Sequence, residues 1–264
     1  MAALFYLMAQ NKPGPYQTLA TELHRKGQLK IGDYMVKPHS AAEDTMYELK
    51  PSDDRFMNLE MSEVDWIVLA VSRSSESSLA FDGLGTGSTD QLKSVNWPGL
   101  MADLTKAIGG FEQVESVDTS MFGVVVKKSI FGQIHDAFSD SDITSLIEID
   151  KLHQSGKKIM LMIDANMLAQ VSSHSLGDIS KSHWIVYEGN LELFDKDGKP
   201  TKKTSDVLKI KFLAYSWGSD PQTSEKYAAT TGVKSVLQSM VSFRTNGISK
   251  ETWKSTYYGY ISAN

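Results

Sequence analysis

A histidine at the start of an apolar segment is the residue of this sequence best placed to do chemistry. His183 follows a serine-rich polar stretch and opens the apolar run 184–187. A strand beginning there would hold the imidazole half-buried at the edge of a core, where a general base with a pKa near neutral pH is required to lie. The alternative is a structural histidine that hydrogen-bonds a loop carbonyl, and these residues alone leave both interpretations open.

Two further segments carry residue types that belong near such a base. Residues 214–218 read Ala-Tyr-Ser-Trp-Gly and end an apolar run that could pair beside the strand that His183 opens. Near the carboxyl end, Gly259-Tyr260-Ile261 lies in another apolar run with a strand-like composition.

In this order, the three segments resemble the carboxyl-terminal third of papain-like cysteine hydrolases. That family has a His at the start of one strand, Asn-Ser-Trp-Gly at the end of a neighbouring strand, and a Gly-Tyr-hydrophobic strand that closes the sheet. The apolar opening segment, residues 1–7, resembles the body of the buried helix whose amino end carries the family's nucleophilic cysteine. The whole chain is similar to a group of bacterial members that we associate with secreted effectors and toxins of bacterial competition.

The resemblance implies a papain-like α+β fold, with helices packed on a mainly antiparallel carboxyl-terminal sheet, and a peptidase or amidase activity on a peptide or protein. It implies no cofactor, no metal, and an inhibitor protein as a partner. It also implies a protein made in the bacterial cytoplasm and exported without a classical signal peptide. The residues that it places at the site are catalytic His183 and the substrate-binding residues Trp184, Ser216 and Trp217.

The chain departs from the family pattern in two ways. None of its 264 residues is a cysteine, so a nucleophile of this type would lie one or two positions before Met1. The family's base-orienting Asn is replaced by Tyr215, and other candidates for that role are Asn166, Asp164 and Asp220. The alternative to a hydrolase is a catalytically inactive pseudoenzyme that binds a peptide or protein in the inherited cleft.

Both alternatives depend on one geometric expectation. The imidazole of His183 should face the exposed amino end of the first helix across a shared groove. A nucleophilic Ser182 is disfavoured, because adjacent residues of a strand face opposite ways.

Composition excludes several other classes of protein. Of the residues, 41% are hydrophobic, which suits a sizeable core, and no apolar run approaches the roughly 20 residues of a membrane-spanning helix. The formal net charge is −5 and no basic face is visible, which argues against a nucleic-acid partner. The glycines at 83, 85 and 87 lack the context of a phosphate-binding loop, and His174, Asp178 and His183 match no recurring metal-site spacing.

Hydrophobic periodicity and turn residues predict a single α+β domain over 1–264, with most helices before most strands. Helices are expected at 1–9, 16–26, 63–73, 97–108, 142–153 and 222–240, with a short one from 249. Strands are expected at 29–36, 111–117, 121–128, 158–166, 183–189, 191–195, 207–218 and 257–263, and irregular connections at 38–60 and 74–96.

Overall fold

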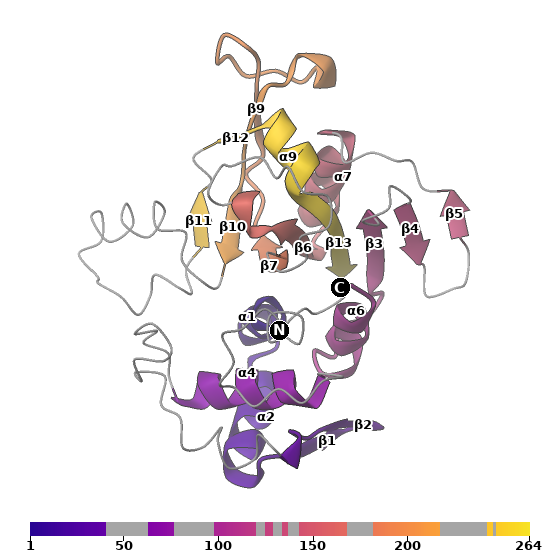
Figure 1. Ribbon diagram of the computed structural model, residues 1–264, viewed down its shortest axis with the longest axis vertical. Coiled ribbons are helices and arrows are strands. Elements are labelled where there is room, and N and C mark those ends of the chain that lie inside the picture. The colour runs from indigo at the N-terminus through magenta and orange to yellow at the C-terminus, as the bar shows by residue number, and fades with distance from the viewer. Residues whose placement is uncertain are drawn as a thin grey trace, which may run out of the picture.

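The computed structural model describes residues 1–40, 63–76, 98–119, 125–128, 134–136, 143–167, 182–216, 242–244 and 247–264. The helices are α1 (Ala2–Asn11), α2 (Pro13–Lys26), α4 (Glu63–Glu76), α6 (Pro98–Ala107), α7 (Ile143–Gln154) and α9 (Lys250–Thr256), with 3₁₀ turns η2 (Ala165–Met167) and η4 (Thr204–Asp206). The strands are β1 (Leu29–Ile31), β2 (Tyr34–Val36), β3 (Glu115–Thr119), β4 (Val125–Lys128), β5 (Ile134–Asp136), β6 (Lys158–Asp164), β7 (Ser182–Tyr187), β8 (Glu192–Phe194), β9 (Lys209–Lys211), β10 (Leu213–Ser216), β11 (Ser242–Arg244), β12 (Ile248–Ser249) and β13 (Tyr257–Ala263). Helices dominate the first part of the described chain and antiparallel strands the rest (Figure 1), so the expected α+β class is confirmed.

Local sequence signals explain the first two helices. α1 is apolar on all sides and buries most of its side chains, as a helix enclosed by other elements does. α2 begins at Pro13, which fits a first helical turn because no N–H is needed there. It ends at Gly27, whose φ of 67° is left-handed and favours glycine. The helices expected at 1–9 and 16–26 are therefore confirmed.

One antiparallel sheet of eight strands organises the carboxyl-terminal half, in the order β11-β10-β7-β6-β13-β3-β4-β5. All but the first residue of β6 are buried, as expected of the unbroken apolar run at 158–166. The last strand, β13, pairs with β6 on one side and β3 on the other. The Gly-Tyr-hydrophobic segment therefore lies inside the sheet and not at its edge.

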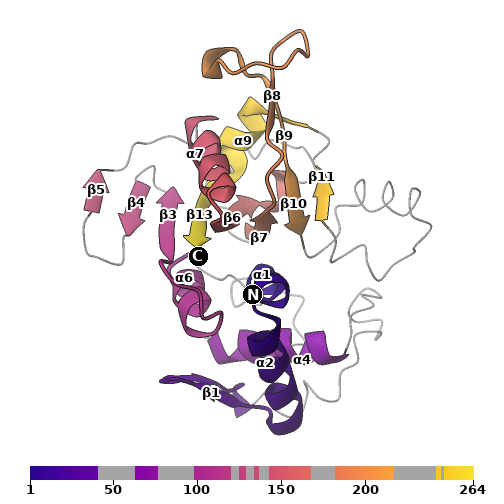
Figure 2. The same cartoon turned by 180° about the vertical axis from the view of Figure 1, so that it is seen from behind.

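Two apolar clusters cover opposite faces of this sheet. The first joins α1, α2, α4 and α6 to sheet residues that include Met160 and Val186. The second joins α7 and α9 to sheet residues that include Ile163 and Ile185. Neighbours such as Ile185 and Val186 belong to different clusters because successive strand residues point to opposite faces. As a result, α1 lies between the sheet and the layer formed by α2 and α4 (Figures 1 and 2).

The segment 207–218, expected to be a single strand, forms two strands in different sheets. β9 pairs with β8 and β12 in a small three-stranded sheet, whereas β10 pairs with β7 in the large one. The cause is the tight turn at Gly189 and Asn190, both with positive φ, which takes the chain out of the large sheet directly after β7. The partner that β9 then meets is β8, and the expectation of one continuous strand is wrong.

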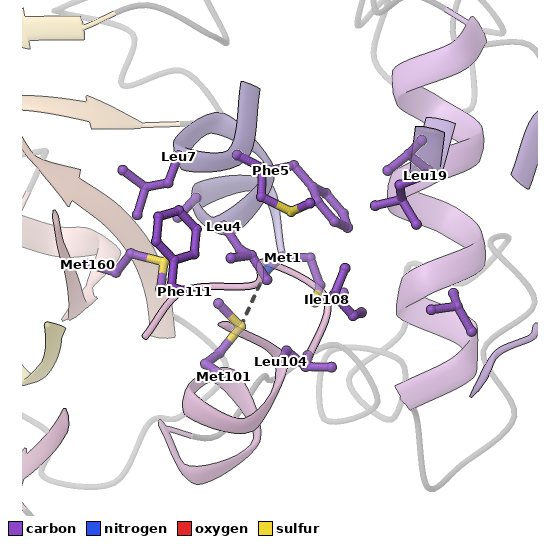
Figure 3. Packing of buried hydrophobic residues seen from close by; sticks show 14 of the residues in the cluster. Met1, Leu4, Phe5, Leu7, Leu19, Met101, Leu104, Ile108, Phe111 and Met160 are labelled. Atoms are coloured by element: carbon purple, nitrogen blue, oxygen red, sulfur yellow. Dashed lines mark hydrogen bonds between the residues drawn. The ribbon is translucent and has the colours of Figure 1, made fainter. Parts of the chain in front are cut away.

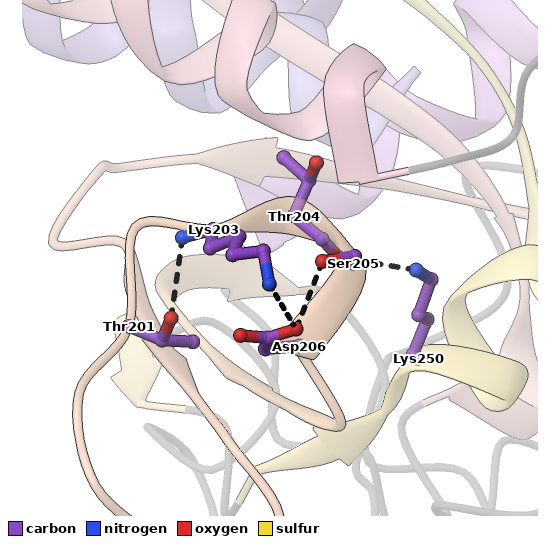
Figure 4. Close-up of polar contacts among 6 residues, drawn as sticks. All are labelled: Thr201, Lys203, Thr204, Ser205, Asp206 and Lys250. Atoms are coloured by element: carbon purple, nitrogen blue, oxygen red, sulfur yellow. Dashed lines mark hydrogen bonds and ion pairs between the residues drawn. The ribbon is translucent and has the colours of Figure 1, made fainter.

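The small sheet projects from the end of the large one (Figure 1), and its buried residues Ile210 and Ile248 join the second apolar cluster. The expected turn after β8 is present, with Asp195 Oδ1 accepting the backbone N–H groups of Asp197 and Lys199 at 2.9 Å each. In the connection to β9, the Lys203 ammonium lies 3.3 Å from the Asp206 carboxylate (Figure 4). These contacts order a connection that lacks an apolar core of its own.

The strand expected at 29–36 is wrong as a single strand, because the chain turns at Gly32 and β1 pairs antiparallel with β2. The other expected elements are either confirmed or not described. Helices α4, α6, α7 and α9 occupy the ranges expected of them, and Ser249 caps α9 by accepting the N–H of Thr252 at 2.9 Å. Most of the connections expected at 38–60 and 74–96, and the helix expected at 222–240, lie outside the described residues, although residues 74–76 continue α4 instead of beginning a loop. The expectation of a single domain stays a prediction.

Candidate active site

His183 lies near the start of β7, between two neighbouring strands. Ile163 of β6 is opposite it in the antiparallel register, and β10 flanks β7 on the other side. The imidazole Nε2 is 2.8 Å from the hydroxyl oxygen of Ser216, the last residue of β10. The expected pairing of the 214–218 strand beside the His183 strand is therefore confirmed, and it brings a hydroxyl to the ring.

Desolvation decides the protonation state of this imidazole. Burial is the main cause, and the charge of the Met1 amino group the second, that together lower the pKa of His183 from 6.5 to about 4. The ring is therefore neutral at pH 7, with one nitrogen protonated and the other able to accept a proton. If Nε2–H donates to Ser216, the accepting nitrogen is Nδ1.

The amino end of α1 is the source of that second effect. Met1 precedes α1 and is buried, and its amino nitrogen lies 3.6 Å from the Met101 sulfur (Figure 3). Burial lowers the pKa of this amino group to about 4, and the charge of Arg73 on α4 adds to the shift. The amino end therefore acts electrostatically on the imidazole, but it is buried and not exposed. Strand alternation places His183 on the same face of β7 as Ile185, opposite to the face that packs on α1, so the expectation that the ring faces this amino end across a groove is wrong.

The surroundings of this amino end are electropositive. The first turn of an α-helix leaves backbone N–H groups without intrahelical partners, and the helix dipole adds a partial positive charge there. The guanidinium of Arg73 lies within electrostatic reach, and burial lowers the pKa of Arg73 to about 10. Such an environment stabilises a negative charge, whether a thiolate or the oxygen of a tetrahedral intermediate.

An aromatic contact joins α1 to the two strands that carry His183 and Ser216. The ring of Tyr6 stacks on Tyr215 of β10, with centroids 3.5 Å apart and planes 11° apart. The Tyr6 hydroxyl donates to the carboxylate of Glu188, which directly follows β7. One side chain of α1 therefore contacts both strands of the site.

The candidate orienting residues take separate places in the structure. Tyr215 faces α1, so its neighbour Ser216 points to the other face of the sheet and meets the imidazole. Asn166 lies in η2, where its backbone N–H donates to Asp164 Oδ1 at 2.8 Å. Asp164 is fully buried and also accepts a hydrogen bond from Tyr258 at 3.2 Å. Asp220 lies outside the described residues.

The candidate substrate-binding residues are only partly described. Trp184 is half-buried and packs against the apolar cluster that contains α1. Ser216 is 3% exposed, so its hydroxyl serves the imidazole rather than an open surface. Trp217 lies outside the described residues.

Sequence reasoning did not find three contacts of this region. They are the hydrogen bond between Ser216 and the imidazole, the stack of Tyr6 on Tyr215, and the hydrogen bond from Tyr6 to Glu188. Ser216 was noticed for its Ser-Trp-Gly context, but its contact depends on the register between β7 and β10. Tyr6 looked like one more apolar residue of α1. Its hydroxyl was the available signal, since a tyrosine in a buried helix usually needs a polar partner.

Other kinds of site receive little support from the described residues. Within them, no cluster of His, Asp or Glu is arranged to hold a metal ion, and no helix has both the length and the apolar character needed to cross a membrane. A hollow of about 460 Å³ lies at the end of α2, lined by His24, Arg25, Lys26, Lys37 and their neighbours, and does not include His183. Comparisons with protein-family models, curated proteins and solved structures gave no match.

Proposed function

We propose that this protein is a papain-type cysteine hydrolase of the peptidase or amidase class, with His183 as its general acid and base. One observation carries the proposal. A neutral imidazole, bonded through Nε2 to Ser216, lies within electrostatic reach of the amino end of a buried helix. In nucleophilic catalysis of this kind, a base is held by a neighbouring group beside the residue that it activates.

In this proposal the nucleophile is a cysteine placed directly before Met1, at the amino end of α1. The electropositive surroundings there favour the thiolate over the thiol. The Met1 amino group acts electrostatically on His183, and the proposal requires that a residue joined to Met1 be carried within proton-transfer distance of the ring. Ser216 takes the place that the family gives to an Asn, by holding Nε2.

The reaction would proceed by acyl transfer. His183 first takes the proton of the cysteine thiol, and the thiolate then attacks the carbonyl carbon of a peptide or amide. Backbone N–H groups at the start of α1 stabilise the oxygen that becomes negative. As the carbon–nitrogen bond breaks, His183 delivers a proton to the leaving amine and an acyl-thioester remains. Water then attacks the thioester, His183 accepts its proton, and the thiolate leaves.

The finer assignments rest on the resemblance to bacterial effectors and toxins. They are substrate contacts by Trp184 and Trp217, further support of the base by Asn166 or Asp220, export of the protein, and an inhibitor protein as its partner. The substrate in this proposal is a peptide or a protein, and no cofactor takes part.

The decisive experiment begins with the codons directly 5′ of the Met1 codon. If they encode a cysteine in frame, the extended chain should be labelled at that cysteine by iodoacetamide at pH 7 much faster than a free thiol is. The label should depend on His183, with His153→Ala as the matched control. The extended chain should also hydrolyse peptide or amide substrates, and a Cys→Ser variant should not.

The alternative is a pseudoenzyme that binds a peptide or protein without cleaving it. The observation that favours it is the absence of cysteine from the whole sequence. A stop codon or a residue other than cysteine at both upstream positions would overturn the hydrolase and leave the pseudoenzyme. An in-frame cysteine that labels no faster in the wild type than in His183→Ala would do the same.

A further inference from the structure

We propose that the hollow at the end of α2 is a binding site for a small molecule that carries phosphoryl groups. The hollow lies where α2 meets the hairpin of β1 and β2, at the opposite end of the molecule from the small sheet (Figures 1 and 2). Its walls are residues 24–28 and 37–38, and His183 is not among them. The proposal therefore does not rest on the proposed function.

Cationic side chains dominate the lining of this hollow. Arg25, Lys26 and Lys37 carry positive charge at pH 7, and none of the other lining residues is acidic. The chain as a whole has a formal net charge of −5, so such a concentration of cations differs from its average composition. A hollow lined by charges of one sign attracts ligands of the opposite sign.

The fold brings the two walls of the hollow together from separate parts of the chain. α2 ends at Gly27, whose left-handed φ of 67° turns the chain towards β1. β2 returns antiparallel to β1, and the pairing of Leu29 with Val36 places Lys37 beside the end of α2. The wall at Lys37 is anchored, because its backbone N–H donates to the Ser75 hydroxyl of α4 at 3.1 Å. Backbone hydrogen bonds therefore hold both segments that bound the hollow.

One carboxylate offsets part of the positive charge. Glu22 lies one turn before the end of α2, and its two carboxylate oxygens are 3.0 Å from the Arg25 guanidinium and 2.5 Å from the Lys26 ammonium. A single carboxylate shared by two cations leaves an excess of positive charge at the end of the helix. The helix dipole adds only about half a negative charge there, which is less than this excess. An anion in the hollow is therefore bound by side chains and not by the main chain.

The residue types and the volume of the hollow favour a phosphoryl compound over a single small ion. A guanidinium presents paired N–H donors that match two phosphoryl oxygens, and ammonium groups on flexible stems reach the remaining oxygens. The volume of about 460 Å³ lies in the range of small-molecule sites, so there is room for the body that carries the phosphoryl group. The aliphatic stems of Lys26 and Lys37 offer that body an apolar surface. The ligand class that follows is a phosphate or diphosphate ester, either free or as a lipid headgroup.

The first experiment uses inorganic pyrophosphate as the probe and the full chain as the protein. Pyrophosphate should bind, as measured by isothermal titration calorimetry. In NMR spectra it should shift the backbone amide signals of Gly27, Gln28 and Lys37, which lie in the walls of the hollow. Citrate, which carries carboxylates in place of phosphoryl groups, should bind more weakly.

Variants of the lining cations test whether the hollow is the site that pyrophosphate occupies. Arg25→Gln/Lys37→Gln should weaken the binding of pyrophosphate about tenfold or more, because two charged hydrogen-bond donors are lost. Lys196→Gln/Lys199→Gln is the matched control. It removes the same charge from two exposed lysines of the turn that follows β8, and it should leave the affinity unchanged.

A variant of Glu22 should have the opposite effect. Glu22→Gln removes the carboxylate that Arg25 and Lys26 share, so both cations become available to the ligand. The affinity for pyrophosphate should rise about threefold, as expected when one repelling charge is removed at a solvent-exposed site. A surface whose lysines and arginine serve only solubility would show no such gain.

Vesicles distinguish the two sources of the phosphoryl group. If the full chain sediments with vesicles of phosphatidylcholine and phosphatidic acid, and Arg25→Gln/Lys37→Gln does not, the ligand is a lipid headgroup. Pyrophosphate binding without sedimentation assigns a soluble compound. Four results would overturn the proposal: no binding of pyrophosphate, equal affinities of the two double variants, no gain of affinity in Glu22→Gln, or citrate binding as tight as that of pyrophosphate.

Discussion

Two histidines lie near opposite ends of β7, and they differ in the charged groups that act on them. His183 opens the strand, while His153 of α7 packs its ring at 88° against Tyr187, with centroids 5.5 Å apart, at the other end. Burial lowers the pKa of both. Around His153, the charges of Asp150 and Glu188 oppose that effect and the charge of Lys158 adds to it. Around His183, the charge of the Met1 amino group adds to the effect of burial, and no carboxylate opposes it among the causes of the shift.

The difference separates a structural histidine from a candidate base. At the His153 end, the Tyr187 hydroxyl donates to Asp150 at 2.6 Å, and Gly189 lies directly against the imidazole. This polar network is satisfied, and nothing in it requires a reactant. At the His183 end, a neutral ring bonds a serine within electrostatic reach of the amino end of α1, whose helix dipole favours a nearby anion.

The largest effect should come from removing the candidate base. In the cysteine-extended chain, His183→Ala should lower hydrolysis by about 10³-fold, in the range of a lost general acid and base. The free energy of unfolding at pH 7 should change by only about 1 kcal/mol, the contribution of one hydrogen bond. His153→Ala is the matched control, and it should keep most of the activity while losing stability.

Steady-state kinetics measures the loss of activity in each variant, and urea unfolding at pH 7 measures the loss of stability. Retained activity in His183→Ala would place the base elsewhere. A large loss of stability with little loss of activity would make His183 a structural residue like His153.

The second effect tests the packing at the His153 end. Gly189 has a φ of 83°, and a Cβ added there would lie 2.9 Å from two atoms of the His153 ring. Gly189→Ala should therefore lower the free energy of unfolding by about 3 kcal/mol, from backbone strain and overpacking together. Gly198→Ala is the control, since its φ is 72° with open space around the Cβ, and it should cost only about 1 kcal/mol.

Urea unfolding of both variants measures the difference between them. The double variant Gly189→Ala/His153→Ala should recover part of the loss, because the smaller side chain relieves the contact. Equal losses in Gly189→Ala and Gly198→Ala would show that His153 does not press on the Gly189 backbone.

The third effect concerns stability at acid pH. The folded protein holds the pKa of His183 at about 4, below its ordinary 6.5, so between these values the unfolded chain binds a proton that the folded one does not. Stability from this group is intact above pH 6.5 and is lost as the pH falls towards 4. From pH 7 to pH 4.5 the loss should be about 2 kcal/mol.

A comparison of the wild type with His183→Asn isolates this contribution, since asparagine does not titrate. The variant should lose about 2 kcal/mol less than the wild type over the same pH range, as measured by urea unfolding at the two pH values. Equal losses would mean that the imidazole takes up its proton in the folded protein near the ordinary pKa.

Sequence reasoning located the elements of the site better than the contacts within it. The apolar character of α1, the strand that His183 opens and the strand that ends in Ser216 were all predicted from composition and periodicity. These are local properties, and they depend on residues that are neighbours in the chain.

Contacts between strands depend on register, which the periodicity does not fix. Ile210, Phe212 and Ala214 are all buried, so alternation runs unbroken across the change from β9 to β10. The sequence signal that β9 and β10 belong to different sheets lies elsewhere, in the turn at Gly189 and Asn190. For the same reason the sequence pointed to Tyr215 as a candidate partner of the imidazole, while the register brings Ser216 to it.

The smallest effect distinguishes two roles of Ser216. If it only holds Nε2 of His183, Ser216→Ala in the cysteine-extended chain should lower kcat about tenfold, since one neutral hydrogen bond contributes about 1 kcal/mol. KM should not change, because Ser216 is 3% exposed and out of reach of a substrate. Were Ser216 itself the nucleophile, the loss would exceed about 10³-fold, and a fluorophosphonate would label the wild type at this residue. A tenfold loss without labelling makes Ser216 the group that orients the imidazole, and it leaves the attack on the carbonyl to the amino end of α1.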